Sequence, residues 1–388
     1  MTWDITGSGA VANIGRTPGE IFDALCAGQE TRNPLKAFDS GKYRTRHAYE
    51  IDDRAPSGRT PDDRAAAHRD EPLRATKWLI HAVRQALADA GLSDDLSRTP
   101  VLVGTTLREQ RSTELWWTEG TPLHPADLHF GGALRDAFGA VSTYTFANAC
   151  SASLYALGLA TDMIESGTTD TVVVAGTDSI TESAFGMLDR VQNESPQELR
   201  PFDVSHKGML MGEGAVAVVL RRPGTHDRRP LARLKAVSMN CDAGHATAPD
   251  PDGIRAAVLD AHRRAGVSSE DIDLVMLHGS GTPRNDETEA AVLAEVFAGT
   301  GRAPLMTAIK SMTGHTLGGS GLLSLVVAVL AMRRSTVPPV LGLAEPIEQA
   351  AGLGLVRGGA TAADITTAQI NAFGMGGINA VALVEAAA

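Results

Sequence analysis

Short valine-rich segments alternate with alanine- and leucine-rich ones along this chain, and this alternation constrains its fold more than any other feature. The valine-rich segments are PVLVGTTL (100–107), DTVVVAGTDS (170–179), DIDLVMLHGSGT (271–282) and AQINAFGMGGINAVALVE (368–385). Buried strands that alternate with helical segments are typical of layered α/β proteins. We therefore expect an α/β fold with helices packed on buried strands.

Two stretches have the apolar spacing and the end signals of amphipathic helices. In residues 17–29, Thr17 is placed to cap the helix start, and Glu20 follows three residues later. In residues 73–92, apolar residues recur at helical period and Gly91 is placed to end the helix. Residues 45–75 are polar and rich in turn formers, so we expect an exposed insertion there.

The chain has 388 residues, 43% of them hydrophobic and 21% charged, so it can bury a large core as two domains or as one duplicated unit. The clearest change of composition in mid-chain is RRPGTHDRRPLARLKAV, residues 221–237, between two strand-like segments. We place a boundary near Pro230, which divides the chain into halves 1–230 and 231–388. The alternation of strands and helices on both sides suits a divergent duplication.

Charge, cysteine content and hydropathy argue against several classes of protein. The formal net charge of -11 disfavours a nucleic-acid surface, although a local basic patch still permits an acidic partner. Cys26, Cys150 and Cys241 are too widely spaced for a zinc site or a disulfide framework, so we expect no metal and a reducing cytoplasm. We expect neither export nor membrane insertion, because the apolar segment 321–332 is short and interrupted by Ser324.

Cys150 stands in TFANACSASLYALGLATDM, residues 145–163, where small residues precede an apolar helix. A helix start offers free N–H donors and partial positive charge, which lower the pKa of a thiol. A free thiol with a pKa near 8.5 is only about 3% thiolate at pH 7, so this position raises the reactive fraction. The alternative is a small core cysteine, which is our interpretation of Cys26 and Cys241.

Two histidines strengthen the functional interpretation of Cys150. His278 in LHGSGTPRNDETEA and His315 in IKSMTGHTLGGSG each follow a strand-like or loop segment, and Lys310 precedes His315 by five residues. Taken singly, each histidine favours a structural role. The glycines around both let a backbone and a narrow substrate approach the imidazoles closely, which favours a functional role.

Spaced segments along nearly the whole chain resemble the signatures of the β-ketoacyl synthases of the thiolase fold, in the branch of elongating fatty-acid and type II polyketide enzymes. They are ITGSGAV, NACSAS, RPFDVSHKGMLMGEGAVAVVL, HGSGTPRNDETEA, KSMTGHTLGGSG and NAFGMGGINA. The resemblance implies an α/β fold of two similar halves. Each half has helices around a mixed five-stranded sheet, and the halves stack as five layers (αβαβα) and dimerise through the first half.

The resemblance also implies a site. Cys150 is then the acyl-accepting nucleophile, and His278 and His315 complete a triad that acts on a malonyl thioester, with Lys310 beside the second histidine. The backbone N–H groups of Cys150 and Phe373 are expected to hold the thioester oxyanion, and the Phe373 ring to gate the acyl cavity. Both imidazoles must be neutral to donate to an enolate oxygen, and a nearby lysine cation disfavours imidazolium.

Further positions match the family or depart from it. Thr282 matches a threonine that binds the pantetheine arm. Asp286 and Glu289 match acidic positions, which we interpret as structural because the chemistry needs no carboxylate. The departures remove no reacting atom and favour specialised, type II polyketide biosynthesis over housekeeping fatty-acid synthesis. They are Ser280 for threonine, Met375 for a second phenylalanine, Ile378 for threonine, and His206-Lys207 for Arg-Asp.

The resemblance implies no bound cofactor, and substrates carried on the phosphopantetheine of an acyl carrier protein. The acidic recognition helix of such a carrier requires local positive charge, although solvated surface charge is the alternative for each candidate. The candidate docking residues are Arg64, Arg69, Arg74, Lys77, His206 and Lys207. Trp116 and Trp117 are expected to pack in the dimer interface. The dimer partner is a second copy or a chain-length-factor homologue that lacks the nucleophile.

Three alternatives use the same fold. An acyltransferase passes an acyl group from the same kind of site to an alcohol or amine without decarboxylation. A thiolase needs a second cysteine in the C-terminal glycine-rich loop, and no cysteine follows Cys241. A non-catalytic subunit is expected to have lost Cys150 or a histidine. The motifs do not specify the starter unit, the number of elongations or the final product.

Overall fold

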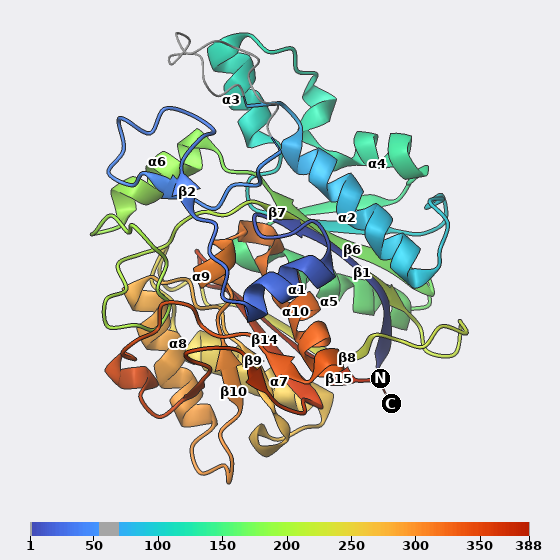
Figure 1. Cartoon of the computed structure of the whole chain (residues 1–388). Helices are drawn as coiled ribbons and strands as arrows, with labels where there is room; N and C mark the ends of the chain where they lie inside the picture. The colour runs from blue at the N-terminus through green and yellow to red at the C-terminus, as the bar shows by residue number, and fades with distance from the viewer. Residues whose placement is uncertain (1, 54–69, 388) are drawn as a thin grey trace.

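One eleven-stranded sheet forms the framework of the protein, and it contains two five-stranded halves, called here the first and the second sheet, with the same arrangement of strands (Figure 1). The structure, a computed structural model, describes residues 2–53 and 70–387. The strand order is β1-β7-β6-β4-β5 in the first half and β8-β15-β14-β9-β10 in the second. In both sheets the first two neighbouring pairs are antiparallel and the last two are parallel. This repetition confirms the expected fold of two similar halves.

The elements have the following bounds. The first sheet comprises β1 (Trp3–Ala12), β4 (Val101–Thr105), β5 (Thr143–Ala147), β6 (Thr171–Asp178) and β7 (Gly214–Arg221). The second comprises β8 (Ala232–Cys241), β9 (Leu274–Met276), β10 (Leu305–Thr307), β14 (Thr367–Gly374) and β15 (Ile378–Ala386), with β12 (Gly354–Leu355) at its edge. Two small ribbons pair β2 (Asn33–Pro34) with β3 (His47–Ala48) and β11 (Thr336–Val337) with β13 (Thr361–Ala362).

The helices also divide between the two halves. Those of the first half are α1 (Pro18–Cys26), α2 (Arg74–Ala90), α3 (Gln110–Glu119), α4 (Phe130–Phe138), α5 (Ala152–Glu165) and α6 (Glu182–Val191). Those of the second are α7 (Pro251–Ala265), α8 (Pro283–Val296), α9 (Lys310–Thr313) and α10 (Ser320–Arg334). Short 3-10 segments are η1 (Pro125–Leu128), η2 (Ala149–Ser151), η3 (Ser269–Asp271), η4 (Leu317–Gly319) and η5 (Glu348–Ala350).

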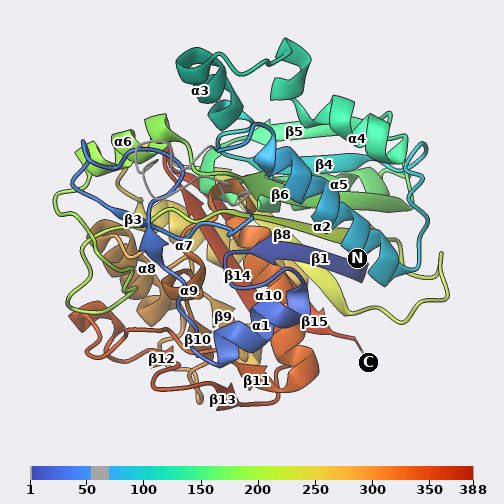
Figure 2. The ribbon, with the colours of Figure 1, turned by 45° about the horizontal axis from the view of Figure 1, so that its top comes forward.

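The helices and sheets stack as five layers (Figures 1 and 2). Helices α5 and α10 lie between the two sheets, α2 and α4 cover the outer face of the first sheet, and α7 and α8 cover the outer face of the second. Side chains of a strand point alternately to the two faces. In β4, Val101 and Val103 pack toward α2, whereas Leu102 packs toward α5 and α10. Strands covered on both faces need apolar residues at every position, which explains the valine-rich segments.

The two sheets are also joined. Strands β1 and β8 pair over Trp3–Ile5 and Ala232–Leu234, so all eleven strands of the large sheet are continuous. The resemblance had implied one five-stranded sheet in each half and did not say whether the two are joined. The join arises because the chain returns after residues 222–231 along the other edge of β1, where the backbone groups of the two strands satisfy each other.

Both helices predicted from end signals are confirmed. Thr17 accepts the backbone N–H of Glu20 at 3.2 Å, and the Glu20 carboxylate accepts the N–H of Arg16 at 2.7 Å at the start of α1. Helix α2 ends at Ala90, and Gly91 follows with a φ of 65° in the left-handed region. Glycine adopts this conformation without the steric cost of a side chain.

The apolar segment 321–332 belongs to a longer helical stretch than we expected. With its preceding turn it spans Leu317–Arg334, 18 residues that are long and apolar enough to cross a membrane by composition alone. Ser324 does not interrupt α10 and is itself buried. Within the protein 83% of the stretch is buried, and its side chains pack in the central layer between the sheets.

The expectation of an exposed insertion at residues 45–75 is wrong for its described ends. Tyr49, Ala48 and Ile51 are fully buried, and Thr45 nearly so. The backbone here finds buried polar partners: the N–H of Ile51 donates to the Glu213 carboxylate at 2.9 Å. Residues 48–51 are therefore held by internal contacts, whereas Asp52 next to them is exposed, as the polar composition predicts. Residues 54–69 lie outside the described residues.

Candidate active site

Cys150 lies in a strained turn between β5 and α5. Ala149 in this turn has a φ of 60°, a left-handed conformation that residues with side chains rarely adopt. Beneath it, Gly104 has no room for a Cβ atom, which would lie 2.3 Å from the backbone nitrogen of Ser153. Cys150 is 7% exposed. The prediction of a cysteine just before a helix is confirmed, since α5 begins at Ala152.

The turn after β9 holds His278 by its backbone on both sides. The His278 N–H donates to Glu289 Oε1 at 2.7 Å, and the Gly279 N–H donates to the other carboxylate oxygen at 2.9 Å. The His278 carbonyl accepts a hydrogen bond from Lys310 Nζ. Gly279 has a φ of 45°, and a Cβ atom there would lie 2.6 Å from the Cβ of Ala308. Glycine is therefore required next to the histidine.

His315 is held between the backbone of residues 210–212 and its own turn. Its N–H donates to the Leu210 carbonyl and its carbonyl accepts from the Gly212 N–H, both at 2.9 Å. The Leu317 N–H donates to His315 Nδ1 at 3.1 Å, so a neutral ring carries its proton on Nε2. Among the described residues, this Nε2 has no hydrogen-bond partner. It is therefore free to donate to a substrate.

The two imidazoles and Cys150 line one cavity of about 60 Å³. The ring centroids of His278 and His315 lie 5.3 Å apart with their planes at 75°. The Phe373 ring lies 5.8 Å from that of His278. Thr282 and the glycine-rich residues 374–377 complete much of the wall. The fold thus brings together a cysteine from the first half and two histidines from the second.

Burial decides the charge of these three groups. The pKa values of His278 and His315 lie well below the ordinary value, because burial and the Lys310 cation both disfavour imidazolium. Both rings are therefore neutral at pH 7, as predicted. Burial raises the pKa of Cys150 to about 11, although Lys310 and the N–H groups of Met375 and Cys150 lower it. The expected fall in the thiol pKa is wrong, because lost hydration outweighs the helix start.

Lys310 combines the two roles that the sequence could not separate. It is the first residue of α9, and its ammonium group ties the His315 loop to the His278 carbonyl. Burial lowers the pKa of Lys310 to about 8, whereas Glu289 raises it. The group is therefore mainly charged at pH 7, and it acts as both hydrogen-bond donor and neighbouring cation.

Met375 supplies a backbone donor near Cys150 that the sequence analysis did not name. The N–H groups that interact with the Cys150 sulfur are those of Cys150 itself and of Met375. Phe373 lies inside β14 in register with Asn379 of β15, and its N–H as a donor to the oxyanion stays a prediction. Met375 follows the end of that strand, where the backbone turns toward the cavity. The gating role of the Phe373 ring stays a prediction.

The acidic residues downstream of His278 hold loops together. Asp286 accepts the backbone N–H groups of Phe202 at 2.9 Å and of Gly281 at 3.2 Å, and His206 Nδ1 lies 3.5 Å from it. Glu289 holds the turn after β9, as described above. These contacts support the structural interpretation of both carboxylates. Thr282 lies at the start of α8 and lines the cavity, with its hydroxyl 2.8 Å from that of Ser280.

Asp178, a fully buried carboxylate at the end of β6, was not predicted from the sequence. It accepts backbone N–H bonds from Thr106 at 2.9 Å, Leu107 at 2.7 Å and Gly318 at 2.8 Å. Burial raises its pKa to about 6. Asp178 thus ties the first sheet to the loop that follows His315. Its signal in the sequence was a single carboxylate at the end of an apolar strand.

Tyr49 was also missed, since its surroundings in the sequence are polar. Its hydroxyl donates to the Ser311 carbonyl at 3.1 Å, and its N–H donates to the Met211 carbonyl at 3.0 Å. Gly314, just before His315, lies against the ring, and a Cβ atom there would come within 2.6 Å of it. Tyr49 therefore forms part of the floor on which the His315 loop rests.

The candidate docking residues do not form one surface. Arg64 and Arg69 lie outside the described residues. Arg74 was expected on the surface, but its side chain is only 4% exposed and pairs with Asp70 at 2.9 Å. His206 is also wrong as a docking residue, because its side chain is 7% exposed and turned toward Asp286. Lys77 and Lys207 are exposed, and they pair with Glu71 at 2.7 Å and Glu194 at 3.0 Å.

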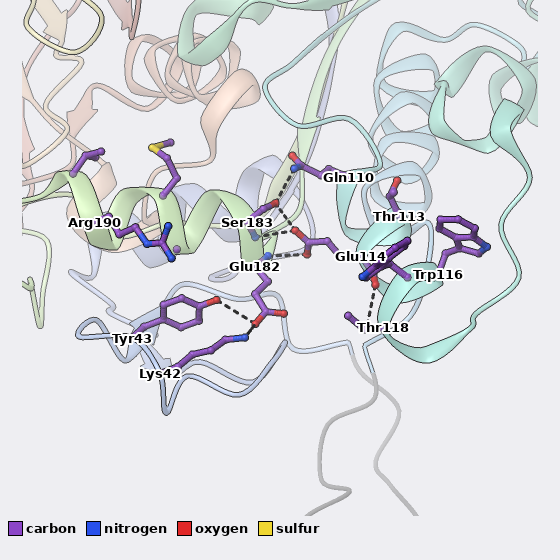
Figure 3. Close-up of a pocket in the computed structure, with 14 residues that line it drawn as sticks. Lys42, Tyr43, Gln110, Thr113, Glu114, Trp116, Thr118, Glu182, Ser183 and Arg190 are labelled. Atoms are coloured by element: carbon purple, nitrogen blue, oxygen red, sulfur yellow. Dashed lines mark hydrogen bonds and ion pairs between the residues drawn. The ribbon is translucent and has the colours of Figure 1, made fainter.

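A larger groove of about 790 Å³ lies elsewhere, between α3, α6 and residues 42–43 (Figure 3). Glu114 of α3 accepts the backbone N–H groups of Glu182 and Ser183 at the start of α6, both at 2.8 Å. Trp116 and Trp117 are 49% and 80% exposed beside it. This groove contains neither the cysteine nor the histidines, so we assign the chemistry to the smaller cavity.

The duplicated five-layered fold, with a cysteine from one half facing two neutral histidines from the other, defines a thiolase-like condensing site. Family models agree with this class. The beta-ketoacyl synthase N-terminal domain matches residues 4–226, and the C-terminal domain matches residues 231–344. The chain therefore belongs to the β-ketoacyl synthase family.

Individual relatives extend over nearly the whole chain. It is 29% identical over 403 residues to 3-oxoacyl-[acyl-carrier-protein] synthase 2 of Coxiella burnetii, with 97% of this chain and 96% of that protein covered. It is 31% identical over 386 residues to the tetracenomycin polyketide synthase ketoacyl synthase alpha subunit of Streptomyces glaucescens, covering 88% and 87%. The solved ishigamide ketosynthase/chain length factor matches with a TM-score of 0.88 and 29% identity, covering 100% of this chain and 99% of that one.

Proposed function

We propose that this protein is an acyltransferase of the β-ketoacyl synthase type, which condenses a malonyl thioester with an acyl chain held on Cys150 and releases carbon dioxide. One observation carries the proposal: Cys150 and the neutral imidazoles of His278 and His315 line the same small, buried cavity. The similarity to 3-oxoacyl synthases and to a polyketide alpha subunit supports this reaction class.

The first step loads the enzyme. The Cys150 sulfur attacks the carbonyl carbon of an acyl thioester, the bond to the carrier's pantetheine sulfur breaks, and the thiol proton passes to the departing sulfur. Burial keeps the thiol protonated before attack, because it raises the pKa of Cys150 to about 11. The Lys310 cation and the N–H groups of Cys150 and Met375 favour the negative charge that develops on sulfur.

The second step makes the carbon nucleophile. The bond from the malonyl carbon to its carboxylate breaks, carbon dioxide leaves, and the electron pair forms an enolate whose oxygen needs aimed donors. His315 has a free Nε2–H for this purpose, and His278 lines the same cavity. Removing one such donor typically raises the barrier by about 3 to 4 kcal/mol.

The third step forms the carbon–carbon bond. The enolate carbon attacks the Cys150 thioester, and the oxyanion of the tetrahedral intermediate accepts hydrogen bonds from the N–H groups of Cys150 and Phe373, with the Met375 N–H as the alternative to the second. The bond to the Cys150 sulfur then breaks, the thiolate takes up a proton from water, and the product is a β-ketoacyl chain on the extender's carrier. Met375 also packs against the apolar cluster that contains Phe185 and Leu317, which places this cluster next to the cavity for an acyl chain.

We propose that both substrates arrive on the phosphopantetheine of an acyl carrier protein, with Thr282 holding the arm at the cavity. Among the candidate docking residues we favour Lys207, whose side chain is exposed. Its neighbour His206 contacts Asp286 of α8, the helix that begins just after Thr282, so Lys207 lies near the proposed path of the arm. A solved relative, a type II polyketide acyl-carrier protein in complex with its ketosynthase, supports this partner. The departures at Met375 and Ile378 favour type II polyketide biosynthesis.

We infer a dimer through the first half, with a second copy or a chain-length-factor homologue. Strand β5 ends the sheet as the structure describes it, and Tyr144 on it is 47% exposed. Such an edge pairs readily with another strand. The exposed Trp116 and Trp117 are suited to packing in the same interface. The solved ishigamide relative combines a ketosynthase with a chain length factor, which supports the heterodimer.

We further propose that the chain divides functionally near Pro230. Residues 1–230 supply the nucleophile and the dimer surface, and residues 231–388 supply both histidines. The repeated strand order on the two sides supports this division. We place the protein in the cytoplasm, which is supported by its three cysteines, Cys26, Cys150 and Cys241, all of them free thiols.

The test uses the purified full-length protein with an acyl-carrier thioester and malonyl-carrier. We expect release of carbon dioxide and a carrier-bound product two carbons longer by mass spectrometry. Cys150→Ala should form no acyl-enzyme, whereas His315→Ala should load normally and release no carbon dioxide. Ester or amide formation without carbon dioxide would support the acyltransferase alternative. Equal loading of the wild type and Cys150→Ala would refute the assignment of the nucleophile.

A further inference from the structure

Four buried polar side chains connect an outer helix with the turn that carries His278. His262 lies on α7, Gln369 and Asn371 on β14, and Glu289 on α8. His262 Nε2 is 2.7 Å from Gln369 Oε1, Gln369 Nε2 is 2.8 Å from Asn371 Oδ1, and Asn371 Nδ2 is 3.0 Å from Glu289 Oε1. None of the four residues is more than 4% exposed. We call this series the donor chain.

An ionised Glu289 gives the donor chain a single direction. A carboxylate only accepts, so Asn371 must turn its NH₂ group toward Glu289 and its oxygen toward Gln369. Gln369 must then donate to that oxygen and offer its own oxygen to His262, which has to donate from Nε2. Burial lowers the pKa of His262, so a neutral ring with its proton on Nε2 makes this bond. All three donors therefore point toward the Glu289 carboxylate.

Glu289 connects the donor chain to the active site. Its two oxygens accept the backbone N–H groups of His278 at 2.7 Å and of Gly279 at 2.9 Å. The ionisable groups around it are Lys310, which interacts with it as a cation, and Asp286, which repels it. The His278 ring is neutral. Lys310 in turn donates to the His278 carbonyl, so Glu289 and Lys310 clamp one residue from both sides.

A buried carboxylate stays ionised only if donors replace the water that it has lost. Burial and the charge of Asp286 raise the pKa of Glu289, whereas the N–H groups of Gly279 and His278 and the Asn371 amide lower it. Aligned amides polarise one another, so a donor placed behind Asn371 strengthens the bond that Asn371 makes. Gln369 and His262 stand in that place.

We propose that His262 and Gln369 are positioning residues of the condensing site, which keep Glu289 ionised through Asn371 and thereby fix the His278 turn and maintain a negative charge opposite Lys310. The kinetic side of this inference rests on the proposed function. It extends that function to two residues that do not line the cavity.

The test is the pH dependence of carbon dioxide release by the acyl-loaded protein, measured with malonyl-carrier. Gln369→Met keeps the volume of the side chain and removes both of its hydrogen bonds. We expect the acidic limb of the profile to move upward by about one pH unit, so that kcat falls about tenfold at pH values below the limb, with KM and acyl loading unchanged. The limb moves because Glu289 then takes up a proton more readily.

Two further variants separate the donor from the packing. His262→Leu should shift the acidic limb in the same direction, whereas His262→Gln, which can still donate to Gln369, should restore it. The matched control is Ser238→Ala, because Ser238 donates to Asp260 at 2.9 Å and also joins α7 to the second sheet. This variant loses a bond of the same kind outside the donor chain, and its profile should equal that of the wild type.

A readout that does not depend on catalysis separates this inference from the proposed function. In protein labelled with ¹⁵N-glycine, the Gly279 amide resonance should titrate with Glu289, and at a higher pH in Gln369→Met than in the wild type. If carbon dioxide is not released but this titration shifts, the proposed function fails and the donor chain stands. If Gln369→Met lowers kcat or thermal stability while the limb and the Gly279 titration stay unchanged, the donor chain is only structural and the inference is wrong.

Discussion

Lys310 offers the most quantitative test of the electrostatics of this site. Burial lowers its pKa from 10.5 to about 8, which corresponds to about 3 kcal/mol of lost stability for the charged form. Between these two pH values the unfolded chain binds the proton and the folded chain does not. The free energy of unfolding should therefore rise by about 3 kcal/mol as the pH increases from 8 to 10.5, and it should be independent of this group below pH 8.

The perturbation is Lys310→Met, compared with Lys310 in the Cys150→Ala background so that the thiol does not titrate in the same range. Urea denaturation across the pH series gives the free energy of unfolding of both proteins. Their difference should follow the predicted rise, because the other lysines and tyrosines are common to both. A difference that stays flat between pH 8 and 10.5 would show that Lys310 keeps an ordinary pKa. Burial of the cavity would then be weaker than the structure indicates, and it would not account for the neutrality of both histidines.

Three further outcomes follow from the same structure. Gly314→Ala should lower the free energy of unfolding, measured in urea, by at least about 2 kcal/mol. Its Cβ atom would lie 2.6 Å from the Tyr49 ring, and alanine is strained at the φ of 63° found here. Adding Tyr49→Ala should recover only the part of this loss that the clash causes. Arg74→Met should cost about 3 to 5 kcal/mol of stability and leave the affinity of the folded protein for a carrier unchanged, as judged by urea denaturation and by calorimetry. Carbon dioxide release by the loaded enzyme should not be limited by histidine protonation as the pH falls through 6.5, because the pKa values of His278 and His315 lie well below it. A loss centred at 6.5 that stays in place in Gln369→Met would contradict their neutrality, because a limb set by Glu289 should move in that variant.

Much of the fold was accessible from local pattern. Strands covered on both faces must be apolar throughout, and helix ends require caps, so the valine-rich segments, the Thr17 cap and the Gly91 stop were all identified correctly. The interpretation of residues 45–75 was wrong where burial depends on distant residues and not on local pattern. Polar side chains there bind buried partners that come from distant parts of the chain, as the ion pair between Arg74 and Glu213 illustrates. Composition does not distinguish a hydrogen bond to water from one to a buried carboxylate.

Spaced motifs named the residues that we propose react, whereas the electrostatics of these residues were only partly foreseen. Neutral histidines followed from the nearby lysine, and the structure agrees. The pKa of the Cys150 thiol is raised and not lowered, because burial by distant parts of the chain outweighs the effect of the adjacent helix start. The Met375 N–H as a donor to the Cys150 sulfur was not foreseen either, because its place in the turn after β14 depends on how that strand meets the cavity.

Local sequence was enough to name the candidate reacting side chains, the alternation of strands and helices, and the glycines that let the backbone come close to those side chains. Each of these features depends on a few neighbouring residues. The folded chain was needed to show which distant groups share a cavity, which charges are desolvated, and which buried amides are aligned toward Glu289. Such properties depend on surfaces that meet only when both halves of the chain have folded against each other. For this reason two basic residues that look alike in the sequence have different places: Arg74 forms a buried ion pair with Asp70, and Lys310 lies in the candidate active site.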